Sequence, residues 1–75
     1  MAYMSQEGYD KLVAQLKEME TIERPAASAA IAEARDKGDL SENSEYDAAK
    51  EHQAMLEMKI HQLKAVLGTA KIIDT

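Results

Sequence analysis

A heptad-like spacing of residues in the second half of the chain limits its fold more than any other feature. From Tyr46 to Leu67, the members of one stripe recur at intervals of 3, 4, 3, 4, 3 and 4 residues. This spacing is typical of a helix that packs against another helix along a narrow seam. About 25 helical residues, rising about 1.5 Å each, make a rod about 37 Å long. The stripe comprises Tyr46, Ala49, Gln53, Leu56, Ile60, Leu63 and Leu67, with Gln53 as its polar member.

The first half of the chain carries a matching stripe, which predicts a second helical arm. Ser5 is placed to act as its N-cap. Pro25 cannot continue a helix without the loss of a backbone hydrogen bond. We therefore predict a kink or short break near residues 21–24, with Pro25 in the first turn of the following segment. This stripe comprises Tyr9, Leu12, Leu16, Met19, Ala26 or Ala27, Ala30 and Ala34.

The connection between the two stripes, residues 37–43, is short enough to make the helices antiparallel. Gly38 and Gly68 each follow an apolar stretch with a basic residue nearby, as helix C-termini prefer. The predicted fold class is all-α: a long antiparallel helical hairpin, or coiled coil, with its tip at about residues 38–43. Residues 71–74 form a β-branched run that favours a strand.

Composition and charge exclude several classes of protein. The absence of Cys removes disulfide scaffolds, thiol chemistry and Cys-based zinc sites. The net charge of −5 argues against a nucleic-acid-binding module, which is normally basic. No run of roughly 18 apolar residues predicts a membrane span, and no signal peptide is recognisable. We therefore expect a cytoplasmic chain with no membrane partner.

The negative charge is concentrated in the middle of the chain. Residues 36–47 contain five acids and one base. Asp39 and Glu42 are able to provide oxygen ligands for Mg²⁺, provided that another molecule completes the site. Their spacing equally suits a capping box, in which Asp39 is the N-cap of the second helix and Glu42 reaches back to it. On spacing alone, the capping role is favoured.

Other candidate residues near the tip also have two interpretations. Arg35 and Lys37 are placed to touch a phosphate, although basic residues are expected in the last turn of any helix. Tyr46 either contacts a partner or packs on Ala34. No nucleophile–base pair, phosphate-binding glycine loop or HExxH motif predicts catalysis by this chain alone. Two further candidates, interpreted as surface histidines, are His52 and His61.

The tip sequence resembles that of the bacterial Gre transcript-cleavage factors, of the GreA type. The similarity is most specific in Gly38-Asp39-Leu40-Ser41-Glu42-Asn43-Ser44-Glu45-Tyr46, within residues 30–51. Supporting matches lie at residues 4–12, 23–25 and 70–74, so the resemblance covers essentially the whole chain.

The resemblance implies a helical hairpin that enters the secondary channel of bacterial RNA polymerase. Asp39 and Glu42 are then the catalytic and metal-organising pair, which helps the polymerase to hold a second Mg²⁺ and to hydrolyse backtracked RNA near its 3′ end. It implies a transcription elongation factor that rescues arrested complexes, with no enzymatic activity and no small-molecule substrate of its own. The residues implied to meet the polymerase are Leu40, Ser41, Asn43, Ser44 and Tyr46, flanked by Arg35 and Lys37.

Residues 1–75 are interpreted as the N-terminal coiled-coil domain alone, with the family's FKBP-like C-terminal domain absent.

Two alternatives for the function remain open at the level of sequence. Some relatives regulate or inhibit transcription through the same channel without stimulating cleavage. A purely structural hairpin that self-associates through its exposed seam is the other alternative.

Overall fold

The protein is a two-armed helical hairpin. The computed structural model describes residues 2–38 and 43–73. Along the chain lie β1 (Tyr3–Met4), α1 (Gln6–Glu18), the π-helical turn η1 (Met19–Glu23), α2 (Arg24–Asp36), α3 (Ser44–Thr69) and β2 (Lys71–Ile72).

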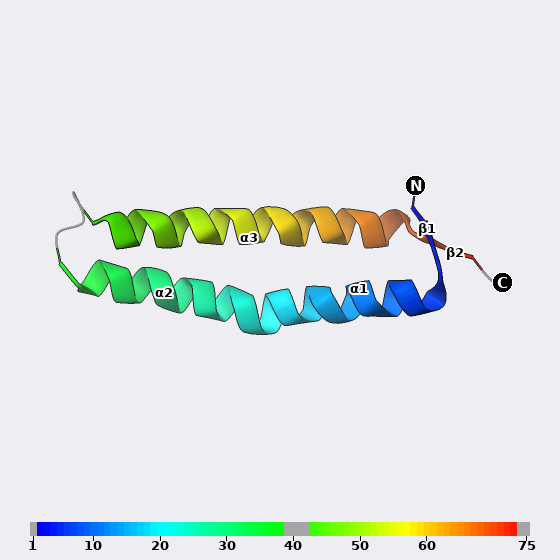
Figure 1. The fold of residues 1–75 in the computed structure, drawn as a ribbon, viewed down its shortest axis with the longest axis horizontal. Coiled ribbons are helices and arrows are strands. Elements are labelled where there is room, and N and C mark those ends of the chain that lie inside the picture. Colours follow the sequence, from blue (N-terminus) through cyan, green and yellow to red (C-terminus); the bar gives the residue numbers. More distant parts are fainter. Residues whose placement is uncertain (1, 39–42, 74–75) are drawn as a thin grey trace.

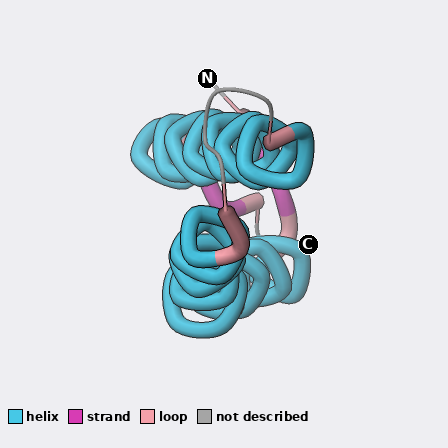
Figure 2. The backbone as a smooth tube through the Cα atoms, turned by 90° about the vertical axis from the view of Figure 1, so that its left-hand side faces the viewer, coloured by secondary structure: helices cyan, strands magenta, loops and turns pink. Residues whose placement is uncertain are grey.

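The first three helical elements form one arm of the hairpin and α3 forms the other. The arms run side by side in opposite directions, with the chain ends together at one end (Figure 1). Seen end on, they form two stacks of helical turns, one above the other (Figure 2). The molecule measures 57 × 19 × 13 Å. The predicted antiparallel hairpin is confirmed, and no helix of the described residues is long and apolar enough to span a membrane.

The core is a thin seam between the arms, as the heptad spacing predicts. Every member of the stripe on α3 is buried or half-buried, and Leu56 and Ile60 are 4% and 2% exposed. Across the seam, Met19 and Ala27 are also buried and complete the central cluster. Small residues in the first arm let the helices approach closely, but they contribute little apolar area to the core.

The stripe on the first arm differs from the prediction beyond Met19. Ala27 and Ala34 are buried and Ile31 is half-buried, whereas Ala30 is exposed. The prediction that Ala30 lies in the seam is therefore wrong. Its cause is local, because η1 places one more residue in its turn than an α-helix does. The seam consequently resumes at Ala27, eight positions after Met19 instead of seven.

The predicted interruption near Pro25 occurs as a π-helical turn, and the chain stays helical through it. The backbone N–H of Arg24 donates to the carbonyl of Met19, five residues earlier. Pro25 has no N–H to donate, so a wider turn is tolerated just before it. The Thr21 hydroxyl donates to the Lys17 carbonyl at 2.7 Å, a contact that tends to bend helices. The arm bows at this cyan segment in Figure 1.

An ion-pair network ties η1 and the start of α2 to α3, and the sequence did not suggest it. Arg24 donates from Nε and Nη2 to the two carboxylate oxygens of Glu57, at 2.9 and 2.8 Å. Glu20 lies 3.8 Å from Arg24 Nη1 and 3.0 Å from Lys64 Nζ. The hydrogen bond between Arg24 and Glu57 raises the pKa of the guanidinium and lowers the pKa of the carboxyl group.

The chain ends meet in a two-residue parallel sheet. Tyr3 pairs with Lys71, and Met4 pairs with Ile72. The N–H of Lys71 donates to the Ala2 carbonyl at 2.7 Å, and that of Ile73 donates to the Met4 carbonyl at 2.8 Å. The strand predicted in residues 71–74 is confirmed for Lys71–Ile72, but its partner at the N-terminus was not predicted.

The start of α1 is as predicted, whereas the end of α3 is not. The Ser5 hydroxyl accepts from the N–H of Gly8 at 3.0 Å, so the predicted N-cap is confirmed. Gly68 does not end α3, because this helix continues through Thr69 and its C-cap is Ala70. The Thr69 hydroxyl donates to the Ala65 carbonyl at 3.3 Å and extends the last turn.

Candidate functional site

The candidate site is the turn end of the hairpin, where most of the net negative charge of the chain is concentrated. Helix α2 ends at Asp36, and the N–H of Lys37 donates to the Ala34 carbonyl at 3.3 Å. Gly38 follows with φ at +148°, a conformation that side-chain-bearing residues rarely adopt. The helix end predicted at Gly38 is confirmed.

Asn43 closes the hairpin by using both ends of its side-chain amide. Its Oδ1 accepts from the N–H of Tyr46 at 3.1 Å, which makes Asn43 the N-cap of α3. Its Nδ2 donates to the Ala34 carbonyl at 2.6 Å, near the end of α2. One half-buried side chain therefore satisfies an orphan donor of one helix and a carbonyl near the end of the other.

The capping box predicted for Asp39 and Glu42 does not begin α3. The helix starts at Ser44, and its N-cap is Asn43, with φ −85° and ψ 94°. An N-cap side chain accepts from the backbone N–H two or three residues later. The N–H of Tyr46 is therefore within reach of Asn43, but Asp39 lies seven positions before Tyr46. The prediction that Asp39 caps this helix is wrong. Asp39, Leu40, Ser41 and Glu42 lie outside the described residues.

The basic residues beside the tip face carboxylates of the same chain. Lys37 Nζ lies 3.2 Å from Glu45 Oε2, across the turn, and 3.8 Å from Glu33 Oε1. Arg35 Nε lies 3.6 Å from Asp36 Oδ1. All of these side chains are exposed, so the pairs contribute little to stability. They offset part of the local negative charge and remain accessible to a partner.

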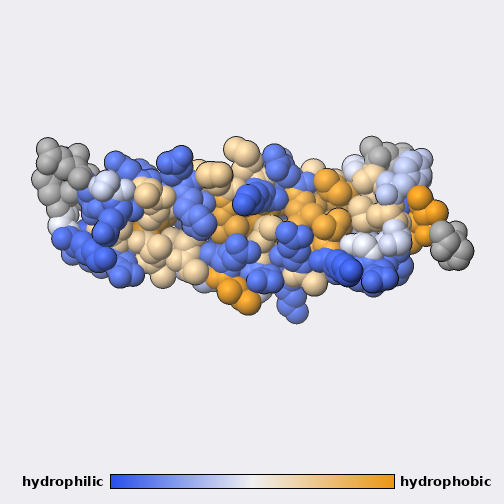
Figure 3. All heavy atoms as spheres, in the orientation of Figure 1, coloured by the Kyte–Doolittle hydropathy of each residue, from blue (hydrophilic) through white to orange (hydrophobic). Residues whose placement is uncertain are grey.

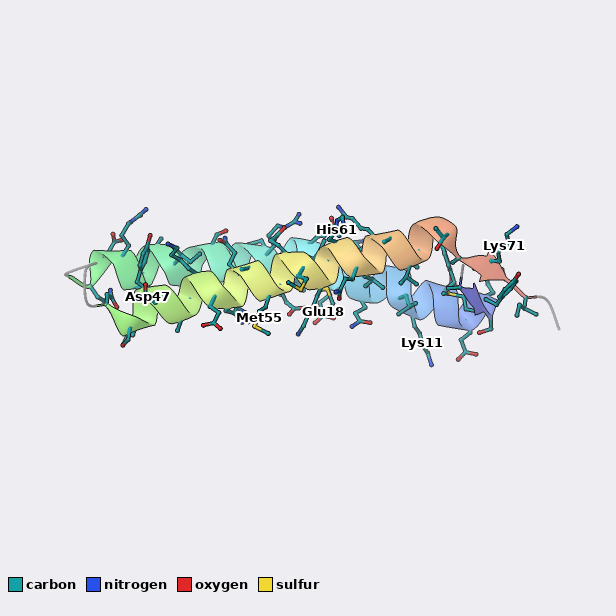
Figure 4. All side chains as sticks on the ribbon, turned by 90° about the horizontal axis from the view of Figure 1, so that it is seen from above. Lys11, Glu18, Asp47, Met55, His61 and Lys71 are labelled. Atoms are coloured by element: carbon teal, nitrogen blue, oxygen red, sulfur yellow. The ribbon has the colours of Figure 1, made fainter. Side chains whose placement is uncertain are left out.

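Tyr46 and Ser44 occupy the first turn of α3. Ser44 is exposed, and Tyr46 is half-buried. Lys50 Nζ lies 5.0 Å from the centroid of the Tyr46 ring, within the range of a cation–π contact. Asp47 lies close to the turn, whereas Lys71 lies at the opposite end of the rod (Figure 4). The ring of Tyr46 is thus held by its own helix beside an acidic surface.

The described residues, 2–38 and 43–73, hold no preformed metal site, either beside the turn or along the rest of the rod. No three His, Cys, Asp or Glu side chains in these ranges lie close enough to hold a metal ion. His52 and His61 are exposed, as predicted. His61 and Met55 project from opposite edges of the rod (Figure 4).

One open groove lies along the middle of the rod. Its volume is about 500 Å³, and Met19, Leu63 and Val66 form its apolar side. Figure 3 shows the strongest apolar colour between the middle of the rod and its open end. Polar and charged groups also line the groove, from Gln15, Glu23, Lys59 and Gln62. The two charges are of opposite sign, and the groove holds no pair of acids for metal binding.

Comparison with known proteins places this geometry in a family. Residues 2–72 match the model of the GreA/GreB N-terminal family, described as "Transcription elongation factor, N-terminal". The chain belongs to this family. It is 57% identical over 74 residues to transcription elongation factor GreA of Flavobacterium psychrophilum and 55% identical to that of Christiangramia forsetii. Each match covers 99% of this chain and 47% of the relative.

The more distant GreA of Paracoccus denitrificans is 49% identical over 71 residues, which cover 95% of this chain. The GreA-type chain thus spans about half the length of the relatives that it matches. Its resemblance to the GreA/GreB family, stated from the tip motif, is confirmed. The functional roles expected for the tip residues stay predictions, and the role that sequence reasoning missed is the bridge made by Asn43. An Asn just before a helix was its only signal.

Proposed function

We propose that this GreA-type chain enters the secondary channel of bacterial RNA polymerase with its turn first and stimulates cleavage of backtracked RNA. The observation that carries the proposal is the acidic turn at the far end of a rod that measures 57 × 19 × 13 Å. Asp36, Glu45 and Asp47 are exposed at this end. A narrow rod can carry such charges into a channel that excludes a globular domain of the same length.

In this proposal, Asp39 and Glu42 act together with the carboxylates of the polymerase. Carboxylate oxygens are the ligands that Mg²⁺ prefers, so these two residues suit the metal chemically. Magnesium bound jointly in this way would neutralise negative charge on the phosphate oxygens during hydrolysis. The residues of this chain complete the metal site and orient water. Since Asn43 caps α3, the proposal does not compete with a capping role for Asp39.

The chain is a factor and not an enzyme in this proposal. The phosphodiester bond is broken at the active centre of the polymerase, which holds the backtracked RNA 3′ end. Release of the cleaved fragment leaves a new 3′ end at the active centre, so that an arrested complex resumes elongation. The site of action is the bacterial cytoplasm, where the polymerase works. The relatives named as transcription elongation factors support this reading.

The test measures RNA cleavage in a stalled, backtracked bacterial elongation complex with the chain at high concentration. Asp39→Asn and Glu42→Gln are compared with Glu51→Gln, which removes the same charge from an exposed position on α3. Circular dichroism checks that all three variants fold. We expect the first two to lose stimulation by about a hundredfold, in the range of a lost electrostatic contact to a reacting centre, and Glu51→Gln to retain it.

Full stimulation by folded Asp39→Asn and Glu42→Gln would overturn the proposed role of the acids. Absence of stimulation by the native chain, combined with inhibition of RNA synthesis, would favour a channel regulator without cleavage activity. Light scattering on the same samples detects self-association, which the structural-hairpin alternative requires.

A further inference from the structure

Asn43 joins the two helices at the one place where the chain reverses direction. The Ala34 carbonyl and the Tyr46 N–H belong to different arms, and the two ends of one amide hold them at 2.6 and 3.1 Å. The side chain of Asn has both an acceptor oxygen and a donor nitrogen, so it can make both bonds at once. Ser or Asp in the same position can cap α3 but cannot replace the bond to the Ala34 carbonyl. The side chain of Ser is shorter than that of Asn, and an ionised Asp has no hydrogen to donate.

We propose that Asn43, for which the family resemblance implies a contact with the polymerase, is instead a positioning residue, which fixes the distance between the two ends of residues 39–42. This inference rests on the proposed function, because it concerns how the acids are presented for cleavage. Proper alignment of a catalytic group matters steeply, and small displacements reduce rates strongly. A turn whose two ends are tied together presents its acids in a narrower range of positions.

A second tie across the turn, between residues that the structure describes, is weaker than the amide bridge. Lys37 and Glu45 lie 3.2 Å apart, but both side chains are more than half exposed. Exposed pairs of this kind are readily replaced by water and salt. The bridge made by Asn43 is half-buried and includes the 2.6 Å bond to the Ala34 carbonyl. It therefore sets the separation of the arms at the turn.

Two substitutions separate the bridge from the cap. Asn43→Asp keeps an oxygen that accepts from Tyr46, but places a second oxygen against the Ala34 carbonyl. Asn43→Ser keeps the cap without adding charge. The Ala34 carbonyl also accepts from the N–H of Lys37 at 3.3 Å, so α2 retains its last backbone bond in both variants. Asn43→Ala removes the cap as well and serves as the reference for loss of both bonds.

The first measurement is the rate of RNA cleavage in a backtracked elongation complex as a function of chain concentration. We expect Asn43→Asp and Asn43→Ser to lower the maximal rate by about tenfold, since misplacement acts on the chemical step. The concentration that gives half-maximal stimulation is expected to stay unchanged. An increase in that concentration with an unchanged maximal rate would show a contact with the polymerase and overturn the proposal. An unchanged rate at every concentration would overturn it too.

The second measurement does not depend on cleavage. The chain has no Cys of its own, so the substitutions Asp36→Cys and Asp47→Cys, both at exposed positions, provide the only two thiols. Each thiol takes one nitroxide label. Electron spin resonance then gives the distribution of distances across the turn. We expect a broader distribution in Asn43→Asp and Asn43→Ser, with the helix content of the native chain. An unchanged distribution would overturn the bridge as the positioning element.

The two measurements also distinguish failure of this inference from failure of the proposed function. If the native chain gives no cleavage at any concentration, the proposed function fails, whatever the label distances show. If the native chain stimulates cleavage and the variants stimulate it equally despite broader distance distributions, only the positioning role of Asn43 fails.

Discussion

Arg24 connects the two arms through one planar group. Its guanidinium meets both oxygens of Glu57 in a parallel, bidentate arrangement, at 2.8 and 2.9 Å. Lys presents a single ammonium group and cannot reproduce that geometry. Because the site is partly open to solvent, its main effect is to fix the register of α2 against α3, and its contribution to stability is small.

The pairing makes the stability of the hairpin depend on pH through Glu57. The pKa of Glu57 in the folded chain is lowered, first by its hydrogen bond with Arg24. The contribution of this carboxylate is therefore complete above the ordinary Glu pKa of about 4.3. It is lost as the pH falls through the lower pKa of the folded chain, because the unfolded chain takes up the proton first.

We expect Glu57→Gln to flatten this part of the pH dependence. Thermal unfolding followed by circular dichroism from about pH 5 to about pH 3 is the measurement. The melting temperature of the native chain is expected to fall more steeply with decreasing pH than that of Glu57→Gln. Glu51→Gln, on the exposed side of the same helix, is the control and should follow the native curve. Parallel curves for native chain and Glu57→Gln would contradict the pairing.

Roles of single residues that depend on neighbours in sequence could be predicted, whereas contacts between residues on opposite sides of the turn could not. Ser5 as an N-cap depends on a few consecutive residues, and the structure confirms it. Asn43 also caps a helix, but its bond to the Ala34 carbonyl joins residues nine positions apart and forms only after the chain has folded back. Spacing placed the cap at Asp39, because a capping box is visible in sequence and a bridge between helices is not.

At the scale of elements, the π-helical turn explains where the stripe on the first arm was predicted correctly and where it was not. The heptad pattern assumes an even helical path, so the predicted stripe holds through Met19. Within α2 the buried positions start again at Ala27 in a shifted phase, which leaves Ala30 exposed. The single residue accommodated by η1 shifts the phase by about 100°. Pro25 located the irregularity, but its type depends on the bond from Arg24 to Met19.

We expect a chain that lacks Ile22 and carries Pro25→Ala to keep the hairpin. Ile22 is 63% exposed, and its removal brings Ala27 to seven positions after Met19, the spacing of a continuous heptad. Removal of Ala14, an exposed residue of α1, instead rotates the preceding part of that helix by about 100°. Circular dichroism during thermal unfolding should show a clearly lower melting temperature for the second deletion. Equal losses from both deletions would contradict the phase argument.

At the scale of the whole molecule, the fold reaches far for its size. A compact globule of 75 residues has a radius of gyration of about 11 Å. The hairpin has a radius of gyration of 16.6 Å over its Cα atoms. Its core is correspondingly thin, and large apolar side chains such as Ile22, Met55 and Met58 remain exposed. The extended shape therefore buries less of the chain's apolar surface than a compact globule of the same length would.

Small-angle X-ray scattering tests this shape directly. We expect a radius of gyration close to 16.6 Å that does not change on dilution, because the apolar seam is already occupied by the other arm. A value that grows with concentration would show self-association through the exposed apolar residues. A value near about 11 Å would contradict the rod.

The hairpin could be predicted from sequence because its two stripes and its short connection are both local features. The sheet at the open end could not, since two-residue strands carry almost no pattern. Tyr3–Met4 finds Lys71–Ile72 as a partner only after the antiparallel arms have brought the chain ends together. The strand tendency of the β-branched run was visible, but its partner was a property of the whole molecule.

The parallel direction of β1 and β2 has a mechanical consequence. When the two ends of the chain are pulled apart, the strands slide along each other and do not peel open one bond at a time. The bonds from Lys71 to Ala2 and from Ile73 to Met4 then resist the tension together. Both must break before the force reaches the helices, so the seam between the arms is shielded from tension applied at the chain ends.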